Sequence, residues 1–192
     1  MKARKFALTM RGITPLVMNS NTGMLDGSED EKKETRDKAG WERDHFMDKT
    51  YRTPSGELYI PARAVKKSMI VACKFLPDKP KGTNFKSFGP FIEAATIVEE
   101  DALLDVSADK VIPWTVVVSL DPSKGPKGPR GPRTRPLSPV PWSAMTTIAS
   151  LDDILTADIL TKITEAAGLK CGLLDARAID MGRCEMVVKE LK

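Results

Sequence analysis

Alternating apolar and polar positions near the N-terminus predict a half-buried strand over Phe6–Met10. Phe6, Leu8 and Met10 lie on one side of an extended chain, and polar residues lie mostly on the other. Further along, apolar residues at helical spacing predict an amphipathic helix over Ala62–Lys74, preceded by a proline suited to a first helical turn. The two periods indicate a mixed α and β chain.

The remaining patterns add three strands and a second helix. A Ser-x-x-Asp start at Ser150 opens a helical apolar stripe that closes at Gly168. Strands are predicted over Phe91–Val98, Val111–Leu120 and Arg183–Leu191. The order strand, helix, strand, strand, helix, strand is the βαββαβ plan of an α+β, ferredoxin-like (RRM-like) fold. We expect a single domain over residues 1–192.

Two stretches interrupt this plan and are predicted to be insertions. Residues 21–52 are highly charged and suit either an exposed helix near Glu31–Asp48 or a mobile segment. Residues 121–142 are rich in proline, glycine and basic residues. Seven prolines and three glycines over Asp121–Pro141 predict neither a helix nor a central strand.

The composition excludes several classes of protein. The 192 residues are 41% hydrophobic, which is enough for a core. No apolar run approaches the ~20 residues that span a bilayer, and no signal peptide is evident, so we expect a cytoplasmic protein without a membrane partner. Three widely spaced cysteines and one histidine provide neither a zinc motif nor a histidine pair for nuclease chemistry. We therefore expect no metal and no cofactor.

Charge is concentrated in the second insertion although the net charge is only +4. Lys124 and the stretch GPKGPRGPR that follows it place basic residues at every third position, namely Lys124, Lys127, Arg130 and Arg133, and Arg135 comes after them. In a polyproline II helix these four side chains would line one edge roughly 9 Å apart. Such a row suits the backbone of a polyanion, because arginine forks onto phosphate and lysine acts as a point charge. A solvated hairpin tip is the alternative.

Two further basic groups belong to the same hypothesis. One face of the predicted helix over Ala62–Lys74 carries Arg63, Lys67 and Lys74, with Lys66 beside them. A merely exposed helix side is the alternative there. The loop before the last strand carries Arg177 and Arg183 between glycines, and such loops present backbone N–H groups to phosphate.

Three further segments carry a family resemblance: Leu8–Ser20, Tyr59–Cys73 and Gly172–Val187. Together they resemble RAMP-type proteins, the RNA-recognition-motif-like superfamily that supplies backbone subunits of CRISPR effector complexes. They are similar above all to small RAMP-like proteins of phages and prophages. Asp175, Arg177, Gly182 and Arg183 match the family's glycine-rich loop, whereas Leu174 and Cys184 depart from it. The resemblance implies that the two insertions are thumb-like or finger-like elements.

The resemblance implies a ferredoxin-like palm that binds single-stranded nucleic acid, RNA or ssDNA, without sequence preference. It also implies a homo-oligomer or repeated subunit, often in a filament, and adds Asn19 of the opening loop to the binding residues. The last strand, Cys184–Leu191, lacks aromatic residues, so backbone electrostatics would dominate over base stacking on that strand. Trp114 and Trp142 are interpreted as core or docking residues.

Two other functions remain open at this stage. The proline-rich segment suits a protein-interaction module, for example a phage inhibitor or scaffold. Some RAMP subunits cleave RNA with a loop aspartate after the first strand, and Asp26 is loosely placed for that role in a metal-dependent ribonuclease. A solvated loop acid is the favoured interpretation of Asp26, so we expect a protein that is not an enzyme.

Overall fold

Strand β1 (Arg4–Gly12) folds as its alternation predicts, because Phe6, Leu8 and Met10 are fully buried. It lies inside a six-stranded antiparallel sheet of order β3-β5-β8-β1-β9, and β4 pairs with β8. This computed structural model describes residues 3–20, 38–76, 80–119, 123 and 128–191. The other strands of the main sheet are β3 (Tyr59–Ile60), β4 (Thr96–Val98), β5 (Ala102–Leu104), β8 (Ser143–Ser150) and β9 (Cys184–Leu191).

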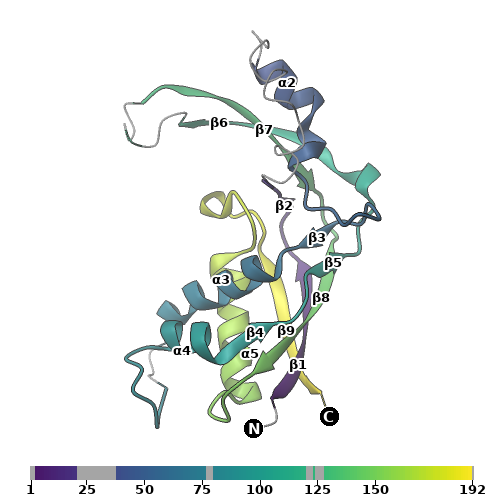
Figure 1. Ribbon diagram of the computed structural model, residues 1–192. Helices are drawn as coiled ribbons and strands as arrows, with labels where there is room; N and C mark the ends of the chain where they lie inside the picture. The colour runs from purple at the N-terminus through teal and green to yellow at the C-terminus, as the bar shows by residue number, and fades with distance from the viewer. Residues whose placement is uncertain (1–2, 21–37, 77–79, 120–122, 124–127, 192) are drawn as a thin grey trace.

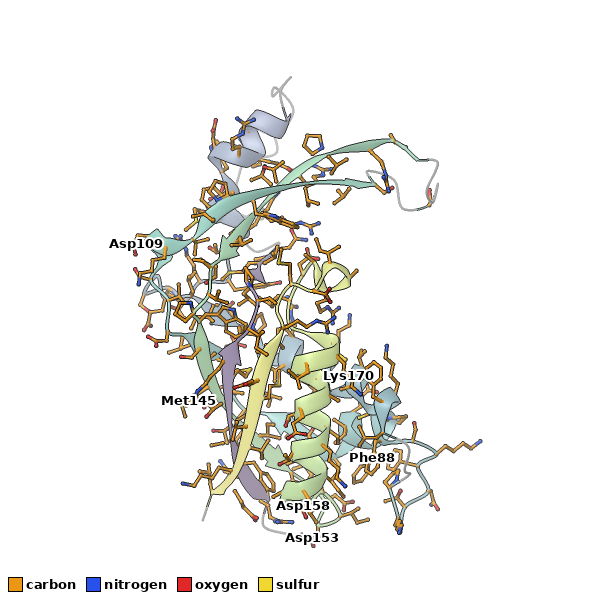
Figure 2. All side chains as sticks on the ribbon, turned by 180° about the vertical axis from the view of Figure 1, so that it is seen from behind. Phe88, Asp109, Met145, Asp153, Asp158 and Lys170 are labelled. Atoms are coloured by element: carbon orange, nitrogen blue, oxygen red, sulfur yellow. The ribbon has the colours of Figure 1, made fainter. Side chains whose placement is uncertain are left out.

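Three helices cover one face of this sheet: α3 (Ala62–Ala72), α4 (Phe88–Ala95) and α5 (Ala157–Ala166) (Figure 1). Each helix buries an apolar stripe, such as Val65 and Met69 of α3, because its apolar residues recur at helical spacing. The opposite face of the sheet is exposed, and Met145 points away from the helix layer (Figure 2). The core therefore lies between the sheet and the helices.

The topology confirms the α+β ferredoxin-like plan. The core elements follow the order β1, α3, β4, β8, α5, β9 along the chain. In the sheet, the last core strand lies beside the first, followed by the third and the second, as β9-β1-β8-β4. Because β1 and β9 pair antiparallel, with Lys5 opposite Leu191, the chain enters and leaves the sheet at the same end (Figure 1).

Several predicted elements are wrong in detail. The strand predicted over Phe91–Val98 is mostly helix α4, whose buried residues at helical spacing include Phe88, Phe91 and Ile92. The third core strand is β8, which the sequence interpretation missed, and Ser150 ends that strand instead of opening a helix. Helix α5 begins later, where the Thr156 hydroxyl accepts a hydrogen bond from the Ile159 amide.

The strand predicted over Val111–Leu120 does form, but it lies in a second sheet. This small sheet has the order β2-β7-β6, with β2 (Leu16–Val17), β7 (Arg130–Ser138) and β6 (Ile112–Ser119). The β6–β7 hairpin projects beyond the main sheet (Figure 1). The proline-rich insertion therefore lies between the second and third core strands, and part of it is a central strand, contrary to the prediction.

The register explains how β7 tolerates its prolines. Thr134 pairs with Thr115 of β6, yet its backbone N–H and C=O point the other way, to Glu42 and Lys49. Pro132 and Pro136 share this orientation because they are two residues away on either side. Their missing N–H groups would point away from β6, so the β6–β7 ladder loses no hydrogen bond.

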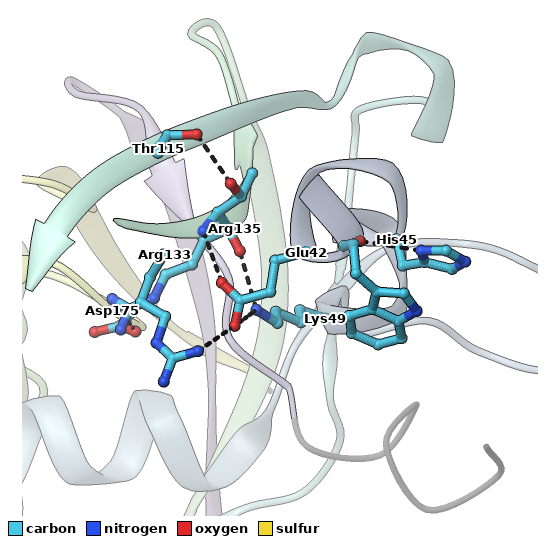
Figure 3. Close-up of polar contacts among 9 residues, drawn as sticks. Glu42, His45, Lys49, Thr115, Arg133, Arg135 and Asp175 are labelled. Carbon is cyan, nitrogen blue, oxygen red and sulfur yellow. Dashed lines mark hydrogen bonds and ion pairs between the residues drawn. The ribbon is translucent and has the colours of Figure 1, made fainter. Parts of the chain in front are cut away.

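A charged cluster from the first insertion completes the outer edge of β7. Helix α2 (Lys38–Asp44) and the 3-10 turn η2 (Phe46–Lys49) lie beside this strand (Figure 1). The Glu42 carboxylate, 3% exposed, accepts hydrogen bonds from the Thr134 amide at 3.2 Å and from Arg133 at 2.6 Å. The Lys49 ammonium lies 3.3 Å from Glu42 and donates to the Thr134 carbonyl (Figure 3).

The electrostatic balance of this cluster favours the charged carboxylate. Burial on its own would raise the pKa of Glu42, but the Thr134 amide, Arg133 and Lys49 outweigh burial and hold the pKa below its usual value. Burial lowers the pKa of Lys49, and Glu42 opposes that shift. The hairpin is therefore anchored by a hydrogen-bonded ionic cluster.

Candidate nucleic-acid interface

One face of α3 presents the basic side chains that its sequence predicts. Arg63 and Lys67 are exposed one turn apart, and Lys74 is exposed in the 3-10 turn η3 (Cys73–Phe75) that follows the helix. The opposite face of α3 packs into the core. Because the helix rises about 1.5 Å per residue, these three cations span roughly 16 Å along one side.

Lys66 is placed differently from its neighbours. Its ammonium donates hydrogen bonds to the carbonyl oxygens of Glu93 at 2.9 Å and Thr96 at 2.7 Å. These carbonyls lie at the C-terminal end of α4, where a helix leaves carbonyl groups without helical partners. Lys66 therefore satisfies the end of α4 and stands apart from Arg63 and Lys67.

The segment Gly172–Arg183 forms a tight loop beside α3. Gly172 and Gly182 have positive φ angles, and a Cβ at Gly182 would collide with the carbonyl of Leu173. Three residues other than glycine share the left-handed conformation: Leu174, Ala176 and Asp180. Such strained positions persist only where surrounding contacts fix them, and they are common at functional sites.

Contacts from three parts of the chain fix this loop. The buried Ser68 hydroxyl of α3 donates to the carbonyls of Ala167 at 3.2 Å and Gly172 at 2.9 Å. The Gly182 amide donates to the Pro15 carbonyl, and the Asp175 amide donates to the Val17 carbonyl. The loop is thus held at a defined distance from the basic face of α3.

A cavity of about 470 Å³ opens between the loop and α3. Three of its basic lining residues are Arg63, Lys67 and Arg177, and Asn19 and Tyr51 complete its polar wall. A second cavity of about 440 Å³ shares the lining residues Asp175 and Arg177 with the first. The basic residues that line the second cavity are Lys74, Lys170, Arg177 and Arg183. We call the two cavities together the basic groove.

The charge of the basic groove is strongly positive. Six cations line it, whereas Asp175 is the one acid among its described lining residues. The Asp175 carboxylate lies 2.7 Å from the guanidinium of Arg135, so an ion pair already neutralises it (Figure 3). Arg183 lies 3.0 Å from Asp180, on the exposed rim. The six cations are Arg63, Lys67, Lys74, Lys170, Arg177 and Arg183.

The pKa of the Cys171 thiol is affected by the same positive charge. Burial raises the pKa of its thiol, and the neighbouring Lys74, Arg183 and Arg177, together with Lys170, oppose that shift. Four cations therefore act on one point of the groove floor. An anion placed there would experience the same field.

Of the four cations predicted as a row, the two that the structure describes, Arg130 and Arg133, do not line one edge. Arg130 and Arg133 lie in β7, where residues three apart face opposite sides, so the polyproline geometry is wrong for this pair. Arg133 pairs with Glu42, and Arg135 pairs with Asp175 at the groove, while Arg130 is exposed. Lys124 and Lys127 lie outside the described residues.

Two groove residues were absent from the sequence interpretation. Lys170 lies just before the glycine-rich loop, within Ala167–Cys171, a short π-helical turn of the kind often found at functional sites. Its proximity to Gly172 in the sequence was a usable signal. Tyr51 carried no signal, because its contact with Asn19 and the groove depends on how the first insertion returns to the sheet.

The described residues contain no group of three or more histidine, cysteine or carboxylate side chains placed to hold a metal ion. His45 stacks on Trp41 with ring centroids 4.6 Å apart and is exposed in the turn between α2 and η2. Asp26, the candidate for RNA cleavage, lies outside the described residues. Trp142 is 2% exposed and donates to the Thr14 carbonyl, in agreement with its interpretation as a core residue. Within the described part of the chain, no helix is long and apolar enough to cross a membrane.

No family model matches this chain, and no curated protein matches its sequence. A solved structure described as type III-B Cmr-beta bound to cognate target RNA contains a similar chain, with a TM-score of 0.60 and 15% sequence identity. The match covers 100% of this chain and 61% of that chain, so this chain spans less than two thirds of its length. Cmr6 from Pyrococcus furiosus is also similar, with a TM-score of 0.49 and 15% identity over 99% of this chain and 98% of Cmr6.

Proposed function

We propose that the basic groove binds the backbone of single-stranded nucleic acid, RNA in particular, and that this chain is a RAMP-type subunit without catalytic activity. The observation that carries the proposal is the set of six cations around two cavities that share lining residues and whose single described acid is already paired. The fold shared with a chain of an RNA-bound complex supports RNA as the ligand.

The geometry of the groove favours a polymer over a small anion. The cations along α3 alone extend from Arg63 to Lys74, roughly 16 Å, which is more than one small anion can contact. A phosphate chain would contact them one after another. Since phosphate contacts carry no sequence information, we expect binding with little sequence preference.

The hairpin has a supporting role in this proposal. Arg135 of β7 reaches Asp175 at the groove, so the hairpin and the loop are connected at the site. Arg130 remains exposed further out along the hairpin. Repeated copies of the chain along one strand, and the likeness to phage and prophage proteins, remain predictions from the sequence.

A salt titration tests backbone binding. Fluorescence anisotropy with a labelled 20-nucleotide RNA, repeated with a single-stranded DNA of the same sequence, measures affinity across a series of NaCl concentrations. For single strands, the slope of log affinity against log salt changes by about 0.7 per phosphate contact. The double variant Lys67→Ala/Arg177→Ala should therefore reduce the magnitude of this slope by about 1.4. It should also weaken binding to every sequence.

The matched control is Lys81→Ala/Lys189→Ala, which removes the same charge from exposed positions outside the groove. This control should retain the slope of the unmodified protein apart from a small general effect of net charge. Absence of binding at low salt, or an equal loss in the control, would contradict the proposal.

A further inference from the structure

The two ends of the basic groove differ in chemistry. Around Cys171 the wall consists of cations and small alkyl side chains, such as Val71, Ala176 and Ala178. At the other end, the aromatic ring of Tyr51 and the amide of Asn19 join the cations Arg63, Lys67 and Arg177. Cations are sufficient to hold phosphate, but an aromatic ring offers a surface for a flat, apolar group.

Tyr51 is fixed in place at the edge of the cavity. It is half-buried, and its hydroxyl donates a long hydrogen bond of 3.4 Å to the Asn19 carbonyl. Its ring lies 5.9 Å from the ring of Tyr59, at an interplanar angle of 53°, and its carbonyl accepts from the Tyr59 amide. Because these contacts order the ring before any ligand arrives, stacking on it costs little conformational entropy.

The cavity at this end has room for more than a phosphate group. Its volume of about 470 Å³ falls within the range of roughly 300–1,000 Å³ typical of small-ligand sites. Its lining residues include three cations and one aromatic residue, Tyr51, and these suit the phosphate and the base of a nucleotide respectively. The Asp175 carboxylate forms an ion pair with Arg135, which weakens its repulsion of a phosphate in this cavity.

We propose that the cavity lined by Asn19 and Tyr51 is a single-nucleotide subsite, in which one base packs on the Tyr51 ring while Arg63, Lys67 and Arg177 hold the adjoining phosphates. This inference rests on the proposed function and adds base contact to it. The subsite accepts any base, because every base has a π-face. The other end of the groove, without Tyr51, contacts backbone alone.

A comparison between two short ligands of equal charge tests the subsite. One is a four-nucleotide RNA, and the other is the same ribose-phosphate chain with every base removed. Both carry the same phosphates, so electrostatic attraction cancels in the ratio of their affinities. Isothermal titration should show that the unmodified protein binds the intact RNA roughly tenfold more tightly.

Three variants locate the effect. Tyr51→Leu keeps an apolar side chain but removes the ring, so it should bring the ratio close to one, whereas Tyr51→Phe should keep it. Lys67→Ala should weaken both ligands by the same factor and leave the ratio unchanged. Thermal unfolding of each variant checks that the fold is retained. The affinity ratio of the unmodified protein tests the subsite even if a variant fails to fold.

The outcomes separate the two proposals. If the unmodified protein binds neither ligand, backbone binding fails and the subsite fails with it. If it binds both equally, or if folded Tyr51→Leu retains the tenfold ratio, the subsite is wrong while backbone binding stands.

Discussion

The main sheet and the β6–β7 hairpin are both antiparallel, yet different forces stabilise them. The main sheet rests on fully buried apolar side chains, such as Phe6, Leu8 and Ile148. The hairpin leaves apolar side chains in water, with Ile112 51% and Val117 63% exposed. Of the strands that the structure describes, β6 pairs with β7 alone, so its other edge is open.

The hairpin depends instead on charged contacts with distant parts of the chain. Glu42 and Lys49 satisfy the outer edge of β7, and Arg135 pairs with Asp175 of the C-terminal loop. Burying charges is unfavourable unless they are paired and hydrogen-bonded, which is the case for this cluster. A few charged contacts therefore stabilise the position of the hairpin, whereas many apolar contacts stabilise the core.

This difference has a consequence for binding. A polyanion in the basic groove would compete for the guanidinium of Arg135, which now neutralises Asp175. Among the described residues, the largest fully buried side chains of the core are all apolar. Changes in salt or ligand should therefore affect the hairpin and the loop before they affect the main sheet.

The largest effect should come from the core. Phe6→Ala removes a fully buried ring from β1, between β8 and β9, and leaves a cavity that the sheet cannot close. We expect the free energy of unfolding to fall by about 3–5 kcal/mol, as measured by chemical denaturation. The loss should appear in every structural probe, the hairpin included. A loss below about 1 kcal/mol would mean that this part of the core is loosely packed.

A smaller and local effect should follow Glu42→Ala. This change leaves Lys49, 7% exposed, without its carboxylate and frees the Thr134 amide. Breaking one partner of a buried ion pair typically costs about 3 kcal/mol or more, and we expect about 2–3 kcal/mol because Arg133 is partly exposed.

Amide hydrogen exchange separates this local effect from a global one. Protection should fall first in β7 and α2, whereas β1 and β8 should keep protection set by global unfolding. Glu185→Ala, at an exposed position of β9, is the matched control and should change little. Equal loss of protection in the main sheet would contradict the distinction between the two regions.

The sequence predicted correctly those elements whose structure follows from a local pattern of apolar and polar residues. The alternation of β1 and the apolar stripe of α3 are local signals, and both elements form as predicted. The ferredoxin-like order was also correct, although it was reached with one wrong strand. In that order the predicted strand over Val111–Leu120 occupied the position that β8 holds in the structure.

Strand β8 was missed because its pattern is weak. Its buried positions Ala144, Thr146 and Ile148 alternate properly, but alanine and threonine give little contrast with their outward neighbours. Strand β7, which precedes β8 in the chain, was missed for another reason. Its prolines are compatible with a strand only because of a register that Thr134, Glu42 and Lys49 establish across the chain.

In the candidate site too, residues placed by a local pattern were predicted, and residues placed by tertiary contacts were not. The helix period placed Arg63 and Lys67 on one face, and the glycine loop placed Arg177 near them, where all three line the groove. The same period could not reveal that Lys66 binds the end of α4. Tyr51 enters the groove through tertiary packing, which no local pattern encodes.

The smallest effect on stability should come from the open edge of the hairpin. Val117 is 63% exposed, so Val117→Lys should change the free energy of unfolding by no more than about 0.5 kcal/mol. A lysine on an edge strand opposes pairing with another strand, so self-association measured by sedimentation should decrease if β6 pairs between copies. A loss of stability near that of Phe6→Ala would show that the β6 edge is covered in solution. The contrast between the two regions would then disappear, because both would depend on apolar burial.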